Sequence, residues 1–155
     1  DKMCAPRYQD IPPEDVPEVA LGEGGKARVL AGSFGGVTGP VQGIVTAPFY
    51  VDFHLAPEQV QEIALPAGHH ALCYCYRGEI SVGPGKHGMH MGLLAVLSDG
   101  DRLTARAGAT ESRFLVIAGQ PIGEPVARYG PFVMNTREEI AQAVEDYRTG
   151  RLLMR

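Results

Sequence analysis

The residue types in this 155-residue chain that could do chemistry gather first in residues 69–75. On a strand, His69, Cys73 and Cys75 would share one face, and an imidazole with two thiolates suits zinc or iron. Adjacent positions on one strand seldom complete a tetrahedral site without ligands from elsewhere. We therefore favour an interpretation in which Cys73 and Cys75 are small buried hydrophobic residues and His69 lies at a turn. A metal site at these three residues is the alternative.

A second group of candidate ligands lies in residues 86–91, which carry two histidines and two methionines. Copper suits imidazole and thioether ligands. Because glycines flank and interrupt this run, we expect a mobile hairpin loop rather than a metal site. His54 stands two residues from Asp52, and we expect the two to form a satisfied surface pair.

The remaining sequence contains no motif that carries chemistry. The glycine-rich segments 22–25 and 32–36 do not lead into a helix, so a phosphate cradle would lack its helix N-terminus, and both predict turns. No Gly-x-Ser-x-Gly elbow occurs, and no serine, histidine and acid can be given triad roles from their spacing. The sequence therefore predicts no catalytic residue, no cofactor-binding residue and no metal ligand in this chain.

Short apolar runs separated by glycine and proline turns predict an all-β fold with many short strands. Alternation is clearest in residues 49–55, where Phe49, Val51, Phe53 and Leu55 share the face that should point into the core. The proline-rich segment 11–18 predicts an extended arm or linker. The expected strands are 27–31, 43–46, 49–55, 60–65, 71–76, 79–82, 93–97, 102–105 and 114–118.

One helix is predicted near the C-terminus. Thr136 and Glu139 have the spacing of a capping box, and Gly150 supplies a stop. An apolar stripe at helical spacing requires a surface to pack on, and it consists of Ile140, Val144 and Tyr147.

Charge and cysteine content limit the classes of partner. The net charge is −4 and the isoelectric point is about 5.7, which argues against binding to nucleic acid. No apolar stretch has the length of a membrane span, so no membrane association is expected. Three cysteines without a secretory context predict reduced thiols and a cytoplasmic protein.

Several segments resemble the C-terminal half of a pirin. They are residues 5–12, 29–32, 65–68, 76–79 and, above all, 118–125 and 129–140. Pirins are bicupins, so the resemblance implies a cupin-type jelly-roll barrel with a C-terminal helix. It implies an extended N-terminal arm or linker at residues 1–25, a degenerate cupin barrel at 26–134, and a C-terminal helix and tail at 135–155. In the family, the N-terminal barrel holds an iron-type metal through three His and one Glu.

The metal ligands of that N-terminal barrel are not found at the matching positions of this chain. The metal-binding half of the family carries its ligands in two sequence motifs. Alignment of the first motif without gaps places its two ligand histidines on Ala64 and Pro66 and its Glu on His70. Alignment of the second motif places its ligand His and Glu on Arg113 and Leu115. The resemblance therefore implies no cofactor in this chain, and iron or another divalent transition metal in an N-terminal half of a parent protein.

The function that the resemblance implies is that of a metal-free C-terminal cupin, a structural partner of the metal-binding N-terminal cupin. In the family, the C-terminal helix reaches the N-terminal barrel, so the stripe of Ile140, Val144 and Tyr147 is expected to contact that half or a partner protomer. The isolated chain is then not expected to be catalytic. Two alternatives are membership of a quercetin 2,3-dioxygenase-type oxygenase and a redox-linked regulatory protein that acts through protein partners.

Overall fold

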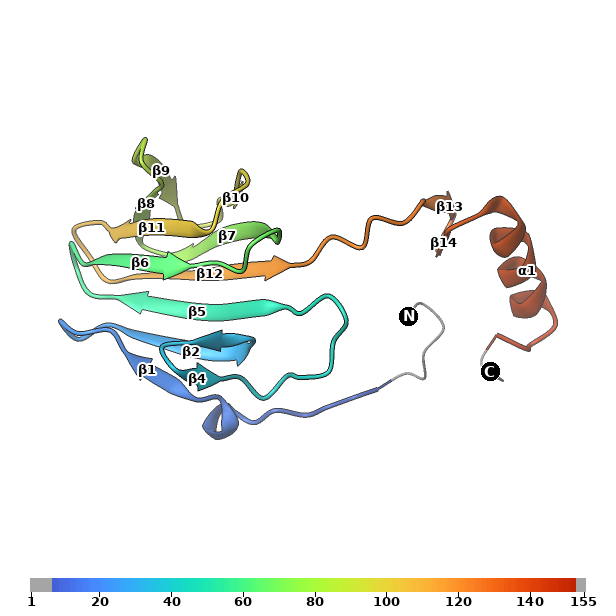
Figure 1. Cartoon of the computed structure of the whole chain (residues 1–155), viewed down its shortest axis with the longest axis horizontal. Helices are drawn as coiled ribbons and strands as arrows, with labels where there is room; N and C mark the ends of the chain where they lie inside the picture. The colour runs from blue at the N-terminus through green and yellow to red at the C-terminus, as the bar shows by residue number, and fades with distance from the viewer. Residues whose placement is uncertain (1–6, 153–155) are drawn as a thin grey trace. The chain divides into compact units, whose positions relative to one another are not determined.

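Two antiparallel sheets, built from residues 9–121, dominate the computed structural model, which describes residues 7–152 (Figure 1). The six-stranded sheet has the order β1 (Glu18–Ala20), β2 (Lys26–Ala31), β5 (Phe49–Leu55), β12 (Ser112–Gly119), β7 (His70–Arg77) and β10 (Leu94–Val96). The four-stranded sheet has the order β6 (Val60–Ala64), β11 (Arg102–Ala107), β8 (Glu79–Val82) and β9 (His87–His90). A 3-10 turn, η1 (Pro13–Asp15), precedes β1, and β3 (Ser33–Phe34) pairs with β4 (Val37–Thr38).

The alternating sequence pattern places one apolar core between these sheets. In β5, Phe49, Val51, Phe53 and Leu55 are buried while the residues between them are half-buried, as the alternation predicts. The rings of Phe53 and Phe114 stack with centroids 5.3 Å apart, and Phe34 meets Phe53 edge-on at 5.1 Å. The four-stranded sheet closes the same core from the other side with apolar residues such as Ile63 and Leu103.

The chain passes from one sheet to the other at Gly78, between β7 and β8. Gly78 has φ of +69°, and a Cβ at this position would lie 2.6 Å from the carbonyl oxygen of Glu111. The hydroxyl of buried Ser112 donates to the carbonyl of Glu79 at 2.6 Å, directly beside this corner. A side chain at residue 78 would be excluded both by the left-handed backbone and by the close approach of β12. The turn at Gly78 therefore requires glycine where the chain crosses from the six-stranded to the four-stranded sheet.

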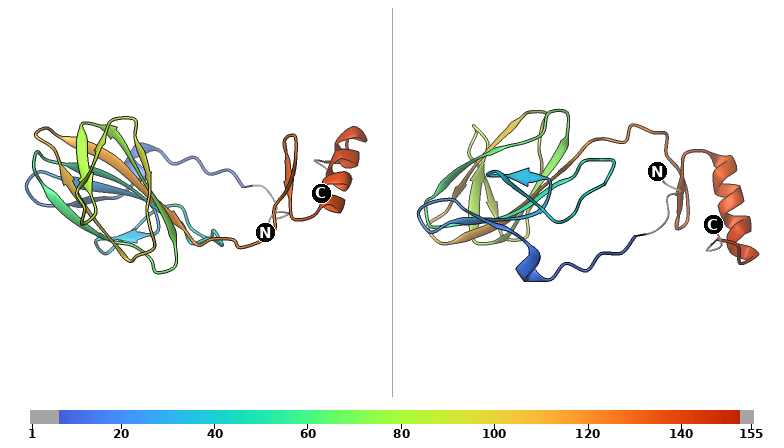
Figure 2. Two further views of the ribbon diagram at one scale, coloured as in Figure 1. Left: turned by 90° about the horizontal axis from the view of Figure 1, so that it is seen from above. Right: turned by 60° about the horizontal axis from the view of Figure 1, so that its bottom comes forward.

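The all-β architecture is confirmed, but the expected barrel is not closed. In the described part of the chain the strands form two separate sheets rather than one continuous hydrogen-bonded ring (Figure 2). The expected strand at residues 43–46 is wrong, because this segment is a loop whose turn is closed by Ala47 donating to the carbonyl of Ile44. The segment expected to be an extended arm contributes β1, which pairs with β2 at the edge of the larger sheet.

Residues 122–152 form a second unit, in which a hairpin packs against a helix. Strands β13 (Ala127–Tyr129) and β14 (Phe132–Met134) make the hairpin, and α1 spans Arg137–Arg148. The predicted capping box is present: the Glu139 amide donates to the Thr136 hydroxyl, and the Thr136 amide donates to the Glu139 carboxylate. Gly150 ends the helix with φ of +74°, as expected. Within residues 7–152 no helix is long and apolar enough to span a bilayer.

The apolar stripe of α1 is only partly covered by its own hairpin. Ile140 is buried, together with Ala143, which the sequence analysis did not place in the stripe. Val144 is half-buried, and Tyr147 is 67% exposed although its ring meets Phe132 edge-on at 6.1 Å. The side of the stripe near Tyr147 is therefore not covered by the hairpin.

Replacing Thr136 by Ala should destabilise α1 by about 1 kcal/mol. The Glu139 amide then loses its acceptor, the Thr136 hydroxyl, and with it one of the two hydrogen bonds of the capping box. Hydrogen exchange of the α1 amides should then be roughly fivefold faster than in the parent protein. Thr136→Ser keeps the hydroxyl and serves as the control. Equal protection in the Ala and Ser variants would show that the box does not stabilise the helix.

Candidate functional site

The structure separates His69 from the two cysteines with which it could have formed a metal site. Cys73 and Cys75 lie on the inward face of β7 and are fully buried. His69 precedes this strand in a turn, where its Nε2 lies 2.9 Å from the carbonyl oxygen of Ala47. The expected burial of both cysteines and the expected position of His69 at a turn are therefore confirmed. Among residues 7–152 no group of three or more His, Cys, Asp or Glu side chains is placed to hold a metal ion.

The environment of the two thiols also makes them poor ligands and poor nucleophiles. Burial raises the pKa of Cys73 to about 12, with a smaller contribution from neighbouring Cys75. Burial raises the pKa of Cys75 as well, and a backbone hydrogen bond with Arg77 opposes this shift. Because the thiolate is the form that reacts and that binds metal, both side chains behave as apolar core residues at neutral pH.

The histidine- and methionine-rich segment forms a strand rather than the expected loop. Residues 87–90 are β9, which pairs with β8 across a turn at residues 83–86. Met89 points into the core and is 5% exposed, whereas His87 and His90 lie on the surface. The pairing of four backbone positions with β8 outweighs the local preference of glycine for loops. These side chains do not converge on one point.

The positions that the motif alignment matched to metal ligands do not point into the space between the sheets. Ala64 is exposed at the end of β6, where the inward residue is Ile63. Arg113 and Leu115 lie on the outer face of β12, whose inward residues include Phe114 and Val116. Since neighbouring residues of a strand point to opposite faces, the inward positions beside these residues are Ile63, Phe114 and Val116, which are all apolar.

A hydrogen-bonded polar cluster lies on the outer face of the six-stranded sheet. His54 Nε2 and Asp52 Oδ2 are 3.0 Å apart, which confirms the expected pair. The hydroxyl of Tyr76 donates to Asp52 Oδ1 at 2.7 Å and lies 3.1 Å from His54 Nε2. Burial, and then the bond to Asp52, raise the pKa of the Tyr76 phenol well above its ordinary value. Sequence analysis missed Tyr76, because the register that brings β7 near β5 across β12 cannot be read locally.

The side chains of the cluster and of its neighbours are hydrogen-bonded to one another. Beside it, Arg113 Nε donates to Glu111 at 2.6 Å, and this bond lowers the pKa of the Glu111 carboxyl and raises that of Arg113. The side chains of Asp52 and His54 are 13% and 15% exposed, and each already has partners within the cluster. Hydrogen bonds within the cluster therefore satisfy these partly buried polar side chains.

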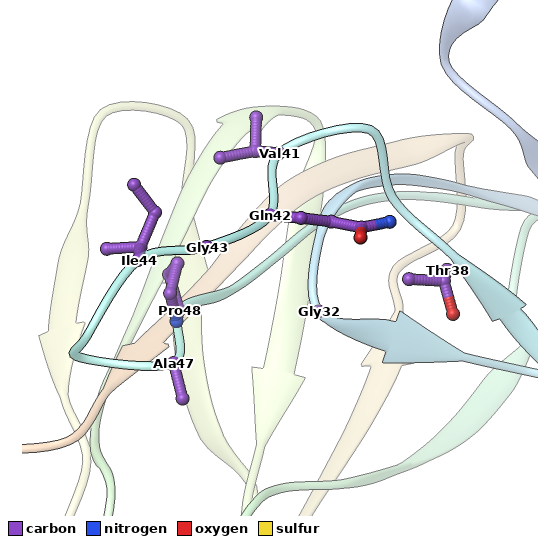
Figure 3. Close-up of a pocket in the computed structure, with 8 residues that line it drawn as sticks. All are labelled: Gly32, Thr38, Val41, Gln42, Gly43, Ile44, Ala47 and Pro48. Carbon is purple, nitrogen blue, oxygen red and sulfur yellow. The ribbon is translucent and has the colours of Figure 1, made fainter. Parts of the chain in front are cut away.

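A shallow, open pocket of about 280 Å³ lies beside the loop that links β4 to β5 (Figure 3). Its walls are backbone and small or apolar side chains, and the polar side chains that line it are Thr38 and Gln42. The Gln42 amide donates to the Gly39 carbonyl at 3.5 Å. No carboxylate, imidazole, thiol or amine side chain is among the residues that line this pocket. The lining residues are Gly32, Thr38, Val41, Gln42, Gly43, Ile44, Ala47 and Pro48.

Comparison with known proteins identifies the family to which this fold belongs. The model of the pirin C-terminal cupin domain matches residues 50–153. A Pseudomonas aeruginosa protein provisionally named a quercetin 2,3-dioxygenase is 41% identical over 98% of this chain and 55% of its own length. Human pirin is 34% identical over 97% of this chain and 52% of its own length.

A solved structure shows the same correspondence. The crystal structure of quercetin 2,3-dioxygenase from Acinetobacter baumannii superposes with a TM-score of 0.87 at 32% identity, over 98% of this chain and 52% of that one. The chain thus spans about half the length of the curated relatives it matches. The family match covers more than half of this chain, and it agrees with the mostly β fold and with the C-terminal motifs. This chain belongs to the pirin family and corresponds to its C-terminal cupin domain.

Proposed function

We propose that this domain is a metal-free structural half of a pirin-like protein, and that residues 122–152 attach it to a metal-binding N-terminal cupin. The proposal rests on the small size of that C-terminal unit and on the exposure of several of its large apolar side chains. Ile140 and Ala143 are the buried hydrophobic residues of α1. A unit of this size cannot bury enough surface to be stable alone, so it requires a further surface to pack on.

The exposed side chains of this unit indicate the nature of that surface. Tyr129 and Tyr147 are 68% and 67% exposed, and Val126 is 77% exposed. Large aromatic side chains are typical anchors of protein interfaces. A partner with an apolar surface is therefore expected, and a tethered N-terminal cupin would hold it at high local concentration.

The interior of this domain does not fit the metal that the resemblance implies for the parent protein. Between the sheets, the inward residues of the central strands are apolar or are neutral thiols, and the space is filled by Phe53, Phe114 and their neighbours. Iron or another divalent transition metal binds imidazole, carboxylate or thiolate ligands, and burial keeps the Cys73 and Cys75 thiols protonated. If the parent protein is a quercetin 2,3-dioxygenase, its metal ligands come from the other half, and this domain supports that half.

The test is binding between residues 1–155 and the N-terminal part of the Pseudomonas aeruginosa relative that this chain does not match, measured by isothermal titration calorimetry. We expect a one-to-one complex. The double substitution Tyr129→Asp and Tyr147→Asp should weaken it at least tenfold, because two exposed anchors are replaced by charges.

Val60→Asp is the matched control, because Val60 is also an exposed apolar residue, at 49%, but lies in β6 of the four-stranded sheet. Its affinity should equal that of the unchanged chain. A tyrosine double variant that binds as tightly as this control would contradict the attachment role, as would a chain that only associates with itself.

A further inference from the structure

Strand β10 leaves an unpaired edge at one end of the six-stranded sheet (Figure 1). On its other side it pairs with β7, and just past its end the Leu97 amide donates to the Ala71 carbonyl. Backbone groups alternate sides along an antiparallel strand, so the N–H and C=O groups of Leu94 and Val96 point away from β7, in the plane of the sheet. In the part of the chain that the structure describes, no strand lies beyond β10 in this sheet.

This edge lacks the features that protect the other edges of the two main sheets. Residues 91–98 contain neither a charged residue nor a proline, and the side chains of Leu94 and Val96 are 54% and 78% exposed. The other terminal strands carry ionisable side chains, which are Glu18 in β1, Glu62 in β6 and two histidines in β9. Natural proteins protect sheet edges with charges, prolines or bulges, because an unprotected edge pairs with a further strand. Among the described strands, β10 is therefore the edge best suited to strand pairing.

A second copy of β10 matches this edge in its backbone and in its side chains. In an antiparallel pair with a two-fold axis at Ala95, Leu94 of each copy lies opposite Val96 of the other. Both of these pairs exchange an N–H···O bond in each direction, so the outward backbone groups of the two strands satisfy one another. Self-pairing brings any charge close to its own copy, and this uncharged segment avoids that repulsion.

We propose that this chain forms a weak symmetric dimer in which the β10 edges of two copies pair and join their six-stranded sheets into one continuous sheet. This contact lies in the plane of the sheet and uses residues other than 122–152, to which the proposed function assigns the attachment. Because β10 has three residues, the pair buries less surface than a standard stable interface. We therefore expect a Kd of roughly 10–100 µM.

Sedimentation equilibrium of residues 1–155 in reducing buffer, from about 5 to 500 µM, measures this association. Val96→Pro removes one outward N–H but keeps the pairing with β7, because proline is tolerated on an edge strand where its nitrogen faces solvent. Val96→Lys keeps the N–H and places a charge in each apolar pair. Each substitution should raise the Kd at least tenfold.

Val60 in β6 provides matched controls on the edge of the other sheet. Its side chain is 49% exposed, and its backbone also points away from the neighbouring strand, because the Ala107 amide donates to the carbonyl of the preceding residue, Gln59. Val60→Pro and Val60→Lys should leave the Kd unchanged. Far-UV circular dichroism and urea denaturation check that every variant is folded.

Hydrogen exchange locates the contact independently of the substitutions. In the concentrated sample the amides of Leu94 and Val96 should exchange at least tenfold more slowly than in the dilute sample, whereas the Glu62 amide should not change. Weaker association in both Val96 variants together with this protection supports the proposal. A chain that stays monomeric overturns it, as does a dimer that Tyr129→Asp with Tyr147→Asp disrupts and the Val96 variants do not.

Discussion

Replacement of Phe114 by Ala should lower the free energy of unfolding of this chain by about 3–5 kcal/mol. Phe114 is fully buried on β12, where its ring stacks on Phe53 and so takes part in the three-ring group that ends at Phe34. Removing the ring takes away its burial and leaves a cavity that the two facing sheets cannot easily collapse to fill. Urea denaturation followed by far-UV circular dichroism measures the change.

Two further variants make this result specific to the aromatic core. Phe114→Leu retains most of the side-chain volume and should cost less than half as much as the Ala variant. Val45→Ala removes apolar atoms from a residue that is 71% exposed, and should change the stability by no more than about 0.5 kcal/mol. A Phe114→Ala loss as small as that of Val45→Ala would show that the space between the sheets is not the principal core.

Local patterns were sufficient to predict the long strands and the helix. Residues 49–55 alternate cleanly because one face of β5 packs on the core, and the capping box of α1 uses residues three positions apart. Several short strands were not predicted in this way. β1, β9, β13 and β14 have three or four residues each, and pairing with a neighbouring strand stabilises them more than their own propensity does. The loop at residues 43–46 was mistaken for a strand for the complementary reason: it is apolar but has no partner strand.

The candidate sites depended on register, which a single sequence does not reveal. Tyr76 reaches Asp52 because β12 lies between β7 and β5, and that order follows from long-range pairing. The outward orientation of Arg113 and Leu115 likewise depends on how β12 pairs with β5 and β7, which the motif alignment could not include. The burial of Cys73 and Cys75 was easier to predict, because small thiols within an apolar strand are usually core residues.

Those buried thiols should make the domain less stable at alkaline pH. The pKa of Cys73 is raised from 9.0 to about 12 in the folded chain, so between these values the unfolded chain binds fewer protons than the folded chain. The contribution is complete below pH 9 and is lost as the pH rises toward 12. We expect Cys73 alone to lower the free energy of unfolding by about 1 kcal/mol between pH 8 and pH 10, and by about 4 kcal/mol at pH 12. Cys75 and Tyr76, whose pKa values are also raised, act in the same direction.

Urea denaturation under reducing conditions, repeated at intervals from pH 6 to pH 10, measures this slope. Cys73→Ala removes the titrating group while keeping a small apolar side chain, so its stability at pH 7 should be somewhat lower but its decline above pH 8 should be shallower. From pH 6 to pH 8 the two proteins should follow parallel curves, because Cys73 does not titrate there in either state. If the stability of the unchanged chain and of Cys73→Ala declined in parallel up to pH 10, the Cys73 thiol would ionise as readily in the folded chain as in the unfolded one. Burial in the core would then not raise its pKa.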